Sequence, residues 1–150
     1  CLETLPRGYH ASGRESQIST NYRAFPAAMQ EIQARCLFNI LHVCDYAAPY
    51  ADYSAVRDYP GHIVNCNTRL AGGEMTPKEI AAWFGRPYMG GLDRHGVLVK
   101  GAPAEVEAEI RRVIGAAPRQ FILAADCTVD SATSWDRLRH AIEVAHRTGS

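Results

Sequence analysis

The chain has 150 residues, 47% of them hydrophobic and 21% charged, which suits one globular domain with a sizeable core and excludes a disordered or collagen-like chain. Its 16 Lys and Arg residues balance 16 Asp and Glu residues, so no charge pattern for nucleic acid or an anionic membrane is present, and we expect neither partner. No apolar run approaches the roughly 18 residues that span a bilayer. The first thirty residues hold no signal-peptide core, so the expected location is the cytoplasm.

Strand-like and helix-like segments alternate along the chain. A short strand is predicted at residues 9–12 and a helix at residues 19–36. A buried strand follows at residues 37–44, and a second apolar strand at residues 62–66. No linker or repeat divides the chain, so residues 1–150 are expected to form one domain.

The clearest helix start in the sequence is a capping box at Thr76, with proline at the first helical position. The helix is expected to stop at Gly85 and to bury Ile80, Trp83 and Phe84 on one face.

The remaining pattern continues the alternation to the C-terminus. A strand at residues 86–92 contains Gly90 and Gly91, which lower its strand propensity but suit a close approach of the backbone to another group. Two more helices are expected, one before and one after an apolar strand at residues 121–125. One begins at Pro103 and presents the stripe Val106, Ile110, Val113 and Ile114; the other runs from Ser134 to Gly149 and presents Leu138, Ala141, Ile142 and Ala145.

Alternating apolar strands and helices predict a parallel α/β sheet covered by helices, either doubly wound or part of a (β/α) barrel. The pattern does not choose between the two folds. A complete eight-stranded barrel takes about 250 residues, so a barrel with the four or five strands seen here would be about half of one.

Three side chains suited to metal binding follow the ends of two predicted strands. In residues 37–44 the period-two geometry places His42 and Cys44 on the same side as Phe38 and Ile40, at the carboxyl end. Cys127 follows the strand at residues 121–125. One His and two Cys ligands with an open fourth position form a known catalytic zinc set; the alternative is a buried histidine and two inert core thiols.

Other polar residues are weaker candidates. Asp93 and Arg94 follow a strand end and could bind substrate or form a structural ion pair. The odd number of cysteines argues against a disulfide framework; Cys66 is expected to be a buried thiol, and Cys1 and Cys36 core or terminal residues. The other side chains are expected to be surface histidines, His95, His140 and His146, and packing tyrosines, Tyr46, Tyr50, Tyr53 and Tyr59.

Five stretches carry a family resemblance in their order and spacing. They are NILHVC at residues 39–44, MGGLD at 89–93, GAPAEV at 101–106, FILAADC at 121–127, and the last helix at 135–147. Together they resemble the C-terminal half of the uroporphyrinogen decarboxylase superfamily. The resemblance implies the C-terminal half of a (β/α)8 barrel, and with the start at Cys1 in place of Met it implies a fragment of a longer chain.

Within this superfamily, zinc-dependent methyltransferases carry their ligands at positions that map onto His42, Cys44 and Cys127, whereas decarboxylases usually have His in place of Cys127. The resemblance therefore implies one zinc ion, a methylated corrinoid as methyl donor and a thiol as acceptor. The sequence departs from the family pattern at Asp45, Gly91, Ala102, Cys66 and Asn67.

The expected function is thus zinc-dependent methyl transfer from a methylated corrinoid, free or on a corrinoid protein, to a small thiol. The first alternative is metal-free decarboxylation of a uroporphyrinogen-like tetrapyrrole with Asp93 and Arg94 near the pyrrole ring. The second is an inactive fragment or binding module. Because half a barrel exposes two sheet edges, the chain is also expected to form a homodimer, join an N-terminal half or aggregate.

Overall fold

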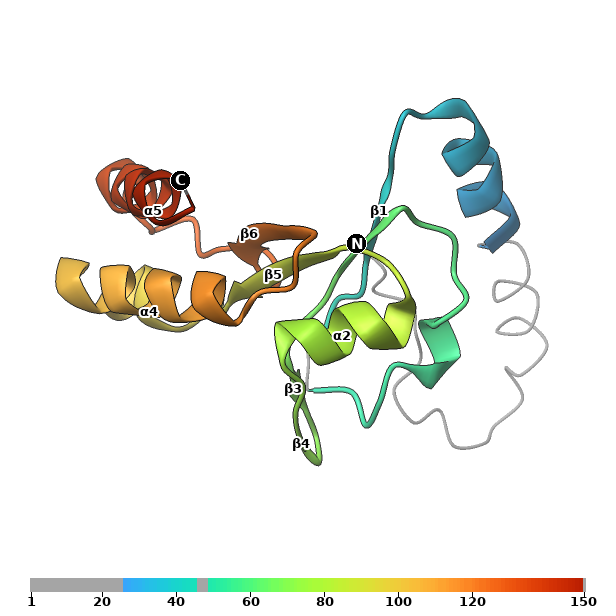
Figure 1. Ribbon diagram of the computed structural model, residues 1–150, viewed down its shortest axis with the longest axis horizontal. Helices are drawn as coiled ribbons and strands as arrows, with labels where there is room; N and C mark the ends of the chain where they lie inside the picture. The colour runs from blue at the N-terminus through green and yellow to red at the C-terminus, as the bar shows by residue number, and fades with distance from the viewer. Residues whose placement is uncertain (1–25, 46–48, 150) are drawn as a thin grey trace.

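The computed structural model describes residues 26–45 and 49–149. Within them, residues 26–35 are helical, and the strands of the main sheet are separated by helical segments along the rest of the chain (Figure 1). The strands are β1 (Ile40–His42), β2 (Ile63–Asn65), β3 (Arg69–Leu70), β4 (Gly73–Glu74), β5 (Tyr88–Leu92) and β6 (Phe121–Ala125). The helices are the 3-10 turn η1 (Ser54–Val56), α2 (Pro77–Phe84), α3 (Val97–Lys100), α4 (Pro103–Ala116) and α5 (Trp135–Thr148). The strand expected at residues 9–12 lies outside the described residues.

The order of the strands settles the choice between the two expected folds. The main sheet runs β1-β2-β5-β6 with every neighbouring pair parallel, so each strand lies beside the next one in the chain, while β3 and β4 form a separate hairpin. A doubly wound sheet would reverse this order at a switch point and carry helices on both faces. An unreversed order with right-handed crossovers places all the helices on one face, as in a (β/α)8 barrel. The described residues therefore form an α/β half-barrel of four parallel strands.

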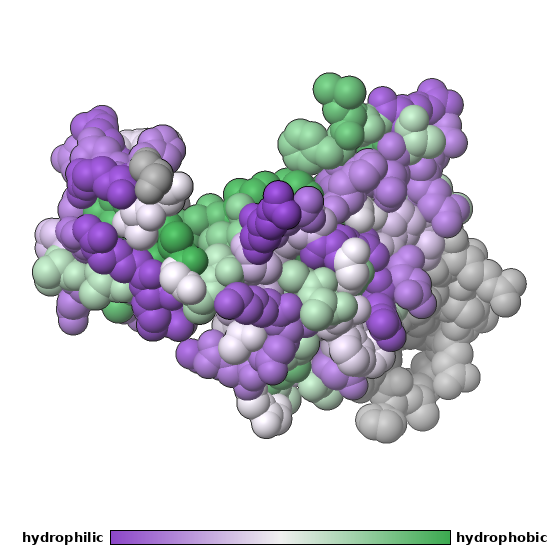
Figure 2. Space-filling model, in the orientation of Figure 1, coloured by the Kyte–Doolittle hydropathy of each residue, from purple (hydrophilic) through white to green (hydrophobic). Residues whose placement is uncertain are grey.

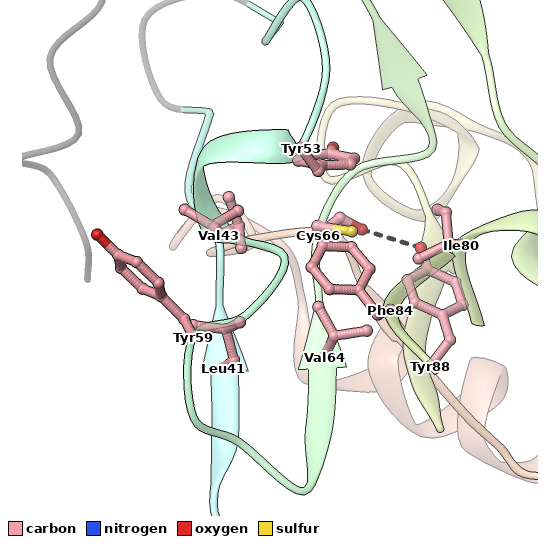
Figure 3. Close-up of a cluster of buried hydrophobic side chains, with 10 residues drawn as sticks. Leu41, Val43, Tyr53, Tyr59, Val64, Cys66, Ile80, Phe84 and Tyr88 are labelled. Atoms are coloured by element: carbon pink, nitrogen blue, oxygen red, sulfur yellow. Dashed lines mark hydrogen bonds between the residues drawn. The ribbon is translucent and has the colours of Figure 1, made fainter. Parts of the chain in front are cut away.

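The helix-covered face of this sheet forms the core. Leu41, Val64, Tyr88 and Phe121 lie side by side in register, and the first three are completely buried. Beneath β1, β2 and β5 they pack against α2 and the tyrosine-containing loop after β1 (Figure 3). The same figure shows the Tyr88 hydroxyl donating a 2.9 Å hydrogen bond to the carbonyl oxygen of Cys66.

A second cluster continues this core under β6, where α4 and α5 cover the strand. Val106, Ile110 and Val113 of α4 are buried against Ala141 and Val144 of α5. Phe121 contacts both clusters, which are therefore continuous. The expected apolar stripe of α4 is confirmed, with Ile114 half-buried at its edge.

The opposite face of the sheet is concave and largely uncovered by the described residues. Its middle row, in register across the four strands, is His42, Asn65, Met89 and Ile122. Ile122 is 43% exposed and Ile40, one row lower, is 37% exposed. Figure 2 shows apolar surface in the hollow between the α4–α5 side and the helix at residues 26–35.

Several helix ends agree with the sequence pattern. The Thr76 hydroxyl accepts a hydrogen bond from the Glu79 amide at 3.2 Å, and the Glu79 carboxylate accepts one from the Thr76 amide at 2.7 Å, which completes the capping box. Gly85 ends α2 with φ of 63°. Ser134 caps α5 through the Arg137 amide at 3.3 Å, and Gly149 is the C-terminal cap.

Two sequence expectations about apolar residues are wrong. The strand predicted at residues 37–44 is only β1, because Leu37 and Phe38 are 101% and 59% exposed in the approach to the sheet. Trp83 is 37% exposed, not buried, and stacks under the Arg57 guanidinium 4.9 Å from its ring centre. Ile142, on α5, is 56% exposed.

The glycine pair of β5 has a structural reason. Gly91 has φ of 95°, a conformation that favours glycine, and a Cβ atom there would lie 2.5 Å from Val113 Cγ1. The missing side chain lets α4 pack directly on the strand, so the expected close approach is confirmed.

Among the described helices none is both long and apolar enough to cross a membrane.

Candidate metal centre

Two strands at opposite edges of the sheet bring three ligand-type side chains to one point. His42 ends β1, Cys44 lies two residues further on, and Cys127 lies two residues after the end of β6. Because a barrel-type sheet curls, the carboxyl ends of its outer strands lean toward each other across the concave face. The ligand atoms of all three side chains lie within 4.8 Å of one another. Cys127 Sγ is 3.4 Å from both Cys44 Sγ and His42 Nε2.

Asn65 fixes which nitrogen of His42 is free to bind a metal. The Asn65 side-chain NH2 donates to the carbonyl oxygens of Met89 at 2.9 Å and Ala125 at 3.1 Å, so its other atom facing His42 is the carbonyl oxygen Oδ1. That oxygen can only accept a hydrogen bond, and its partner is His42 Nδ1. His42 Nδ1 must therefore carry the proton. The lone pair of His42 is then on Nε2, the nitrogen that faces Cys127.

The two thiols differ in their contact with solvent. Cys44 is buried, whereas Cys127 is half-buried at the rim of the site. Burial raises the pKa of the Cys127 thiol, and its interaction with Cys44 raises it further. A bound cation acts in the opposite direction, because a coordinating thiol loses its proton.

The donor set suits one kind of ion. An imidazole nitrogen and two sulfurs are the ligands that zinc takes in proteins, and three protein ligands leave a fourth position for a substrate or water. The His42, Cys44 and Cys127 group can thus hold a metal ion. Of the described histidine, cysteine and acidic side chains, only these three form such a group.

Asp93 and Arg94, the predicted substrate-binding residues, lie in different surroundings. Asp93 is exposed, accepts a 2.7 Å hydrogen bond from the His95 amide and lies 3.8 Å from the Arg69 guanidinium. It also lines a polar cavity of about 300 Å³ together with Gly91. Arg94 is only 8% exposed. A role for either residue in binding substrate stays a prediction.

The Arg94 guanidinium is paired inside the protein. Its Nη1 lies 2.6 Å from Asp45 Oδ1 and 3.7 Å from Asp126 Oδ2, and both carboxylates are buried. Burial alone lowers the pKa of Arg94, but the hydrogen bond and charge of Asp45, aided by Asp126, outweigh it and raise that pKa. Burial also raises the pKa of Asp126, against the opposing effect of Arg94. Asp45 is thus the closer partner of the guanidinium.

The other cysteines lie away from the cluster. Cys66 is completely buried, as expected, and burial raises the pKa of its thiol to about 12, so it is not a nucleophile at neutral pH. Cys36 is exposed, which corrects the expectation of a core or terminal residue. Cys1 lies outside the described residues.

The predicted surface histidines and packing tyrosines are mostly found as expected. His95 and His146 are exposed, whereas His140 is half-buried beside the Pro103 carbonyl oxygen. Tyr53 and Tyr59 are buried in the core. Tyr50 packs against it, and Tyr46 lies outside the described residues.

Three residues of this site, Asn65, Asp45 and Asp126, were not predicted from the sequence. Asn65 is a polar residue at the end of an apolar strand, and that contrast was the available signal. Asp45 and Asp126 each adjoin a candidate ligand cysteine, but a carboxylate next to a cysteine gives no indication of what it pairs with. Their common partner, Arg94, lies on a third segment of the chain.

Neither a protein-family description nor a curated protein sequence matches this chain. A solved structure does match in fold: a methyltransferase from Methanosarcina mazei, with a TM-score of 0.63 and 14% sequence identity over 87% of this chain. The matching region is 38% of that methyltransferase, so the present chain spans under two fifths of its length. The chain thus has an α/β fold similar to part of that larger methyltransferase, with a His-Cys-Cys group at its strand ends that could bind a metal.

Proposed function

We propose that this chain carries the zinc site of an enzyme that transfers a methyl group from a methylated corrinoid to a thiol. The observation that carries the proposal is the convergence of His42, Cys44 and Cys127 from two distant strand ends. The similarity in fold to a methyltransferase supports the reaction class.

The protein's own residues prepare the site. His42 Nε2 and the sulfurs of Cys44 and Cys127 would hold the ion, and Asn65 keeps the ligating nitrogen unprotonated. When bound, zinc would supply a Lewis acid that keeps a substrate thiol deprotonated at neutral pH. The half-buried position of Cys127 leaves one side of the cluster open to such a thiol.

The overall reaction balances without an external oxidant or reductant. The bond between the methyl carbon and cobalt breaks, and its electron pair stays on cobalt, which goes from Co(III) to Co(I). A carbon–sulfur bond forms to the acceptor, and the thiol proton is released to solvent. The donor would be a methylated corrinoid, free or held by a corrinoid protein.

We further propose that the site operates inside a closed barrel. Among the described residues, nothing covers the concave face, where Ile40 and Ile122 are exposed, and no strand pairs with the outer edges of β1 and β6. A second four-stranded half would cover this face and these edges. The partner is a second copy of this chain or a separate N-terminal half. Sedimentation at micromolar concentration should show an assembly larger than one chain, and Ile122→Lys should weaken it without unfolding the protein; a monodisperse monomer with cooperative unfolding would contradict this proposal.

Metal analysis tests the zinc site. Protein purified without chelator should contain close to one zinc ion per chain. Cys127→Ser should lose most of it, because a hydroxyl is a poor substitute for a thiolate. Cys66→Ser, which changes a buried cysteine away from the cluster, is the matched control and should keep its metal. A Cys127→Ser variant with unchanged zinc content would remove Cys127 from the ligand set.

A spectroscopic assay tests the reaction. Methylcobalamin and a panel of small thiols should give a thioether and Co(I) corrinoid in the presence of the zinc-loaded assembly, and neither product with Cys127→Ser. Purified protein without bound metal would instead favour the decarboxylase or the inactive fragment.

A further inference from the structure

The two ligand cysteines lie at opposite edges of the sheet, and β1 and β6 are not paired with each other. Each strand end is fixed to its own neighbour: the Val43 amide donates to the Asn65 carbonyl oxygen, and the Asp126 amide to the Leu92 carbonyl oxygen. Neither bond sets the distance between Cys44 and Cys127. Their 3.4 Å sulfur–sulfur separation therefore depends on side chains that bridge the two edges. Asn65 is one such bridge, since it bonds His42 and the Ala125 carbonyl oxygen, but neither bond is made to a residue next to Cys44 in the chain.

Each ligand cysteine is flanked by a buried carboxylate. Asp45 directly follows Cys44 and is 5% exposed, and Asp126 directly precedes Cys127 and is 3% exposed. Burying a carboxylate without a cationic partner costs folding free energy, so two buried carboxylates need a positive charge nearby.

Arg94 makes a second connection, from the segment after β5. Its Nη1 donates to Asp45 Oδ1 at 2.6 Å, and its backbone amide donates to Asp126 Oδ1 at 2.8 Å. The same guanidinium lies 3.7 Å from Asp126 Oδ2, a buried oxygen that accepts no hydrogen bond among the described residues. The side chain and the backbone amide of Arg94 thus hold Asp45 and Asp126. These two residues directly adjoin the candidate ligands Cys44 and Cys127.

The segment around Arg94 is itself held in place. Its Nε donates to His95 Nε2 at 3.1 Å. The Asn67 side chain donates to the second oxygen of Asp45 at 2.9 Å, so the position of that carboxylate is fixed from both sides.

We propose that Arg94 is a positioning residue that clamps the two cysteine-bearing strand ends together and so sets the geometry of the metal centre before an ion binds. The clamp acts on the apo protein, and only its consequence for metal affinity rests on the proposed function. The positive charge of Arg94 also interacts with Cys127, and would offset the negative charge of that thiolate as a ligand.

The test compares Arg94→Gln, which removes the charge and shortens the side chain, with Arg94→Lys, which keeps the charge. The control is Arg86→Gln. Arg86 is half-buried and, like Arg94, has a structural role, since its Nη1 donates to the carbonyl oxygens of Tyr59 at 2.8 Å and Gly61 at 2.7 Å. It precedes β5, at the amino end of the sheet, so its loss can cost stability without loosening the strand ends near the cysteines.

The first readout needs no metal. Oxidised glutathione converts the Cys44 and Cys127 thiols into a disulfide and releases two molecules of reduced glutathione for each bond formed, and peptide mapping identifies the bond. We expect the rate of closure to fall at least tenfold in Arg94→Gln, to be intermediate in Arg94→Lys and to stay within twofold of the original rate in Arg86→Gln.

The second readout is zinc affinity by chelator competition. Loss of an outer-shell partner typically weakens metal binding about 10- to 100-fold, and we expect this range for Arg94→Gln and no change for Arg86→Gln. Closure and affinity both within twofold of the original chain would overturn the clamp. If the original chain binds no zinc, the proposed function fails, but the closure rate still decides the clamp. If Arg94→Gln does not fold, Asp45→Asn replaces it with the same thresholds.

Discussion

The two faces of the sheet have different roles, and consecutive residues of each strand lie on opposite faces. On the helix-covered face, Leu41 of β1 and Val64 of β2 are completely buried. On the concave face, their neighbours in the chain are His42, which reaches the metal-ligand cluster, and Asn65, which orients it. Because side chains alternate along a strand, each short strand contributes to stability with one residue and to the site with the next.

The two faces of the sheet should differ in how well they tolerate substitutions. The covered face is packed by α2, α4 and α5, so a lost methyl group there leaves a cavity. The concave face has no such cover among the described residues, so its apolar side chains add little to the folding of one chain and are available to a partner.

The largest expected effect is on the covered face. Leu41→Ala should lower the free energy of unfolding by about 2–5 kcal/mol, because it opens a cavity in a fully buried position. Ile40→Ala, one residue earlier and 37% exposed, should cost about 1 kcal/mol or less. Denaturant unfolding of the two variants measures the difference. Equal costs would show that the concave face is also packed.

A smaller effect is expected from the residue that orients His42. Asn65→Ala removes the acceptor for His42 Nδ1 and should weaken zinc binding about 10- to 100-fold. The control is Met89→Leu, a change at the register neighbour of Asn65 on the same face, which should leave zinc affinity within about twofold. Unchanged affinity in Asn65→Ala would mean that another group sets the tautomer of His42.

The smallest effect concerns the helix layer. Thr76 caps α2 with its hydroxyl, whereas Ala102 at the start of α4 offers its amide to Glu105 but has no oxygen to accept from the helix. Ala102→Ser should therefore raise the free energy of unfolding by about 0.5–1 kcal/mol, and Thr76→Ala should lower it by about 1 kcal/mol. Thermal unfolding of both variants gives the comparison. Destabilisation by Ala102→Ser would mean that the α4 start cannot accept a polar cap.

The sequence by itself determined the local structure and indicated the candidate ligands. Capping residues, proline positions and apolar periodicity depend on neighbours in the chain, so the starts of α2, α4 and α5 could be predicted. His42 and Cys44 share a strand side by simple alternation. The residues whose burial depends on distant elements were less predictable: Trp83 was expected in the core, but only the tertiary structure shows it exposed beside Arg57.

Only the tertiary structure decided the choice of fold and the outer shell of the site. Pattern left a doubly wound sheet and a barrel equally open, because both alternate strands and helices; the unreversed strand order distinguishes them. Asn65, Asp45, Asp126 and Arg94 come from four separate segments, and nothing in their spacing indicates that they meet. Side-chain partners across a sheet follow from curvature and register, which are properties of the whole packed chain and not of any stretch of sequence.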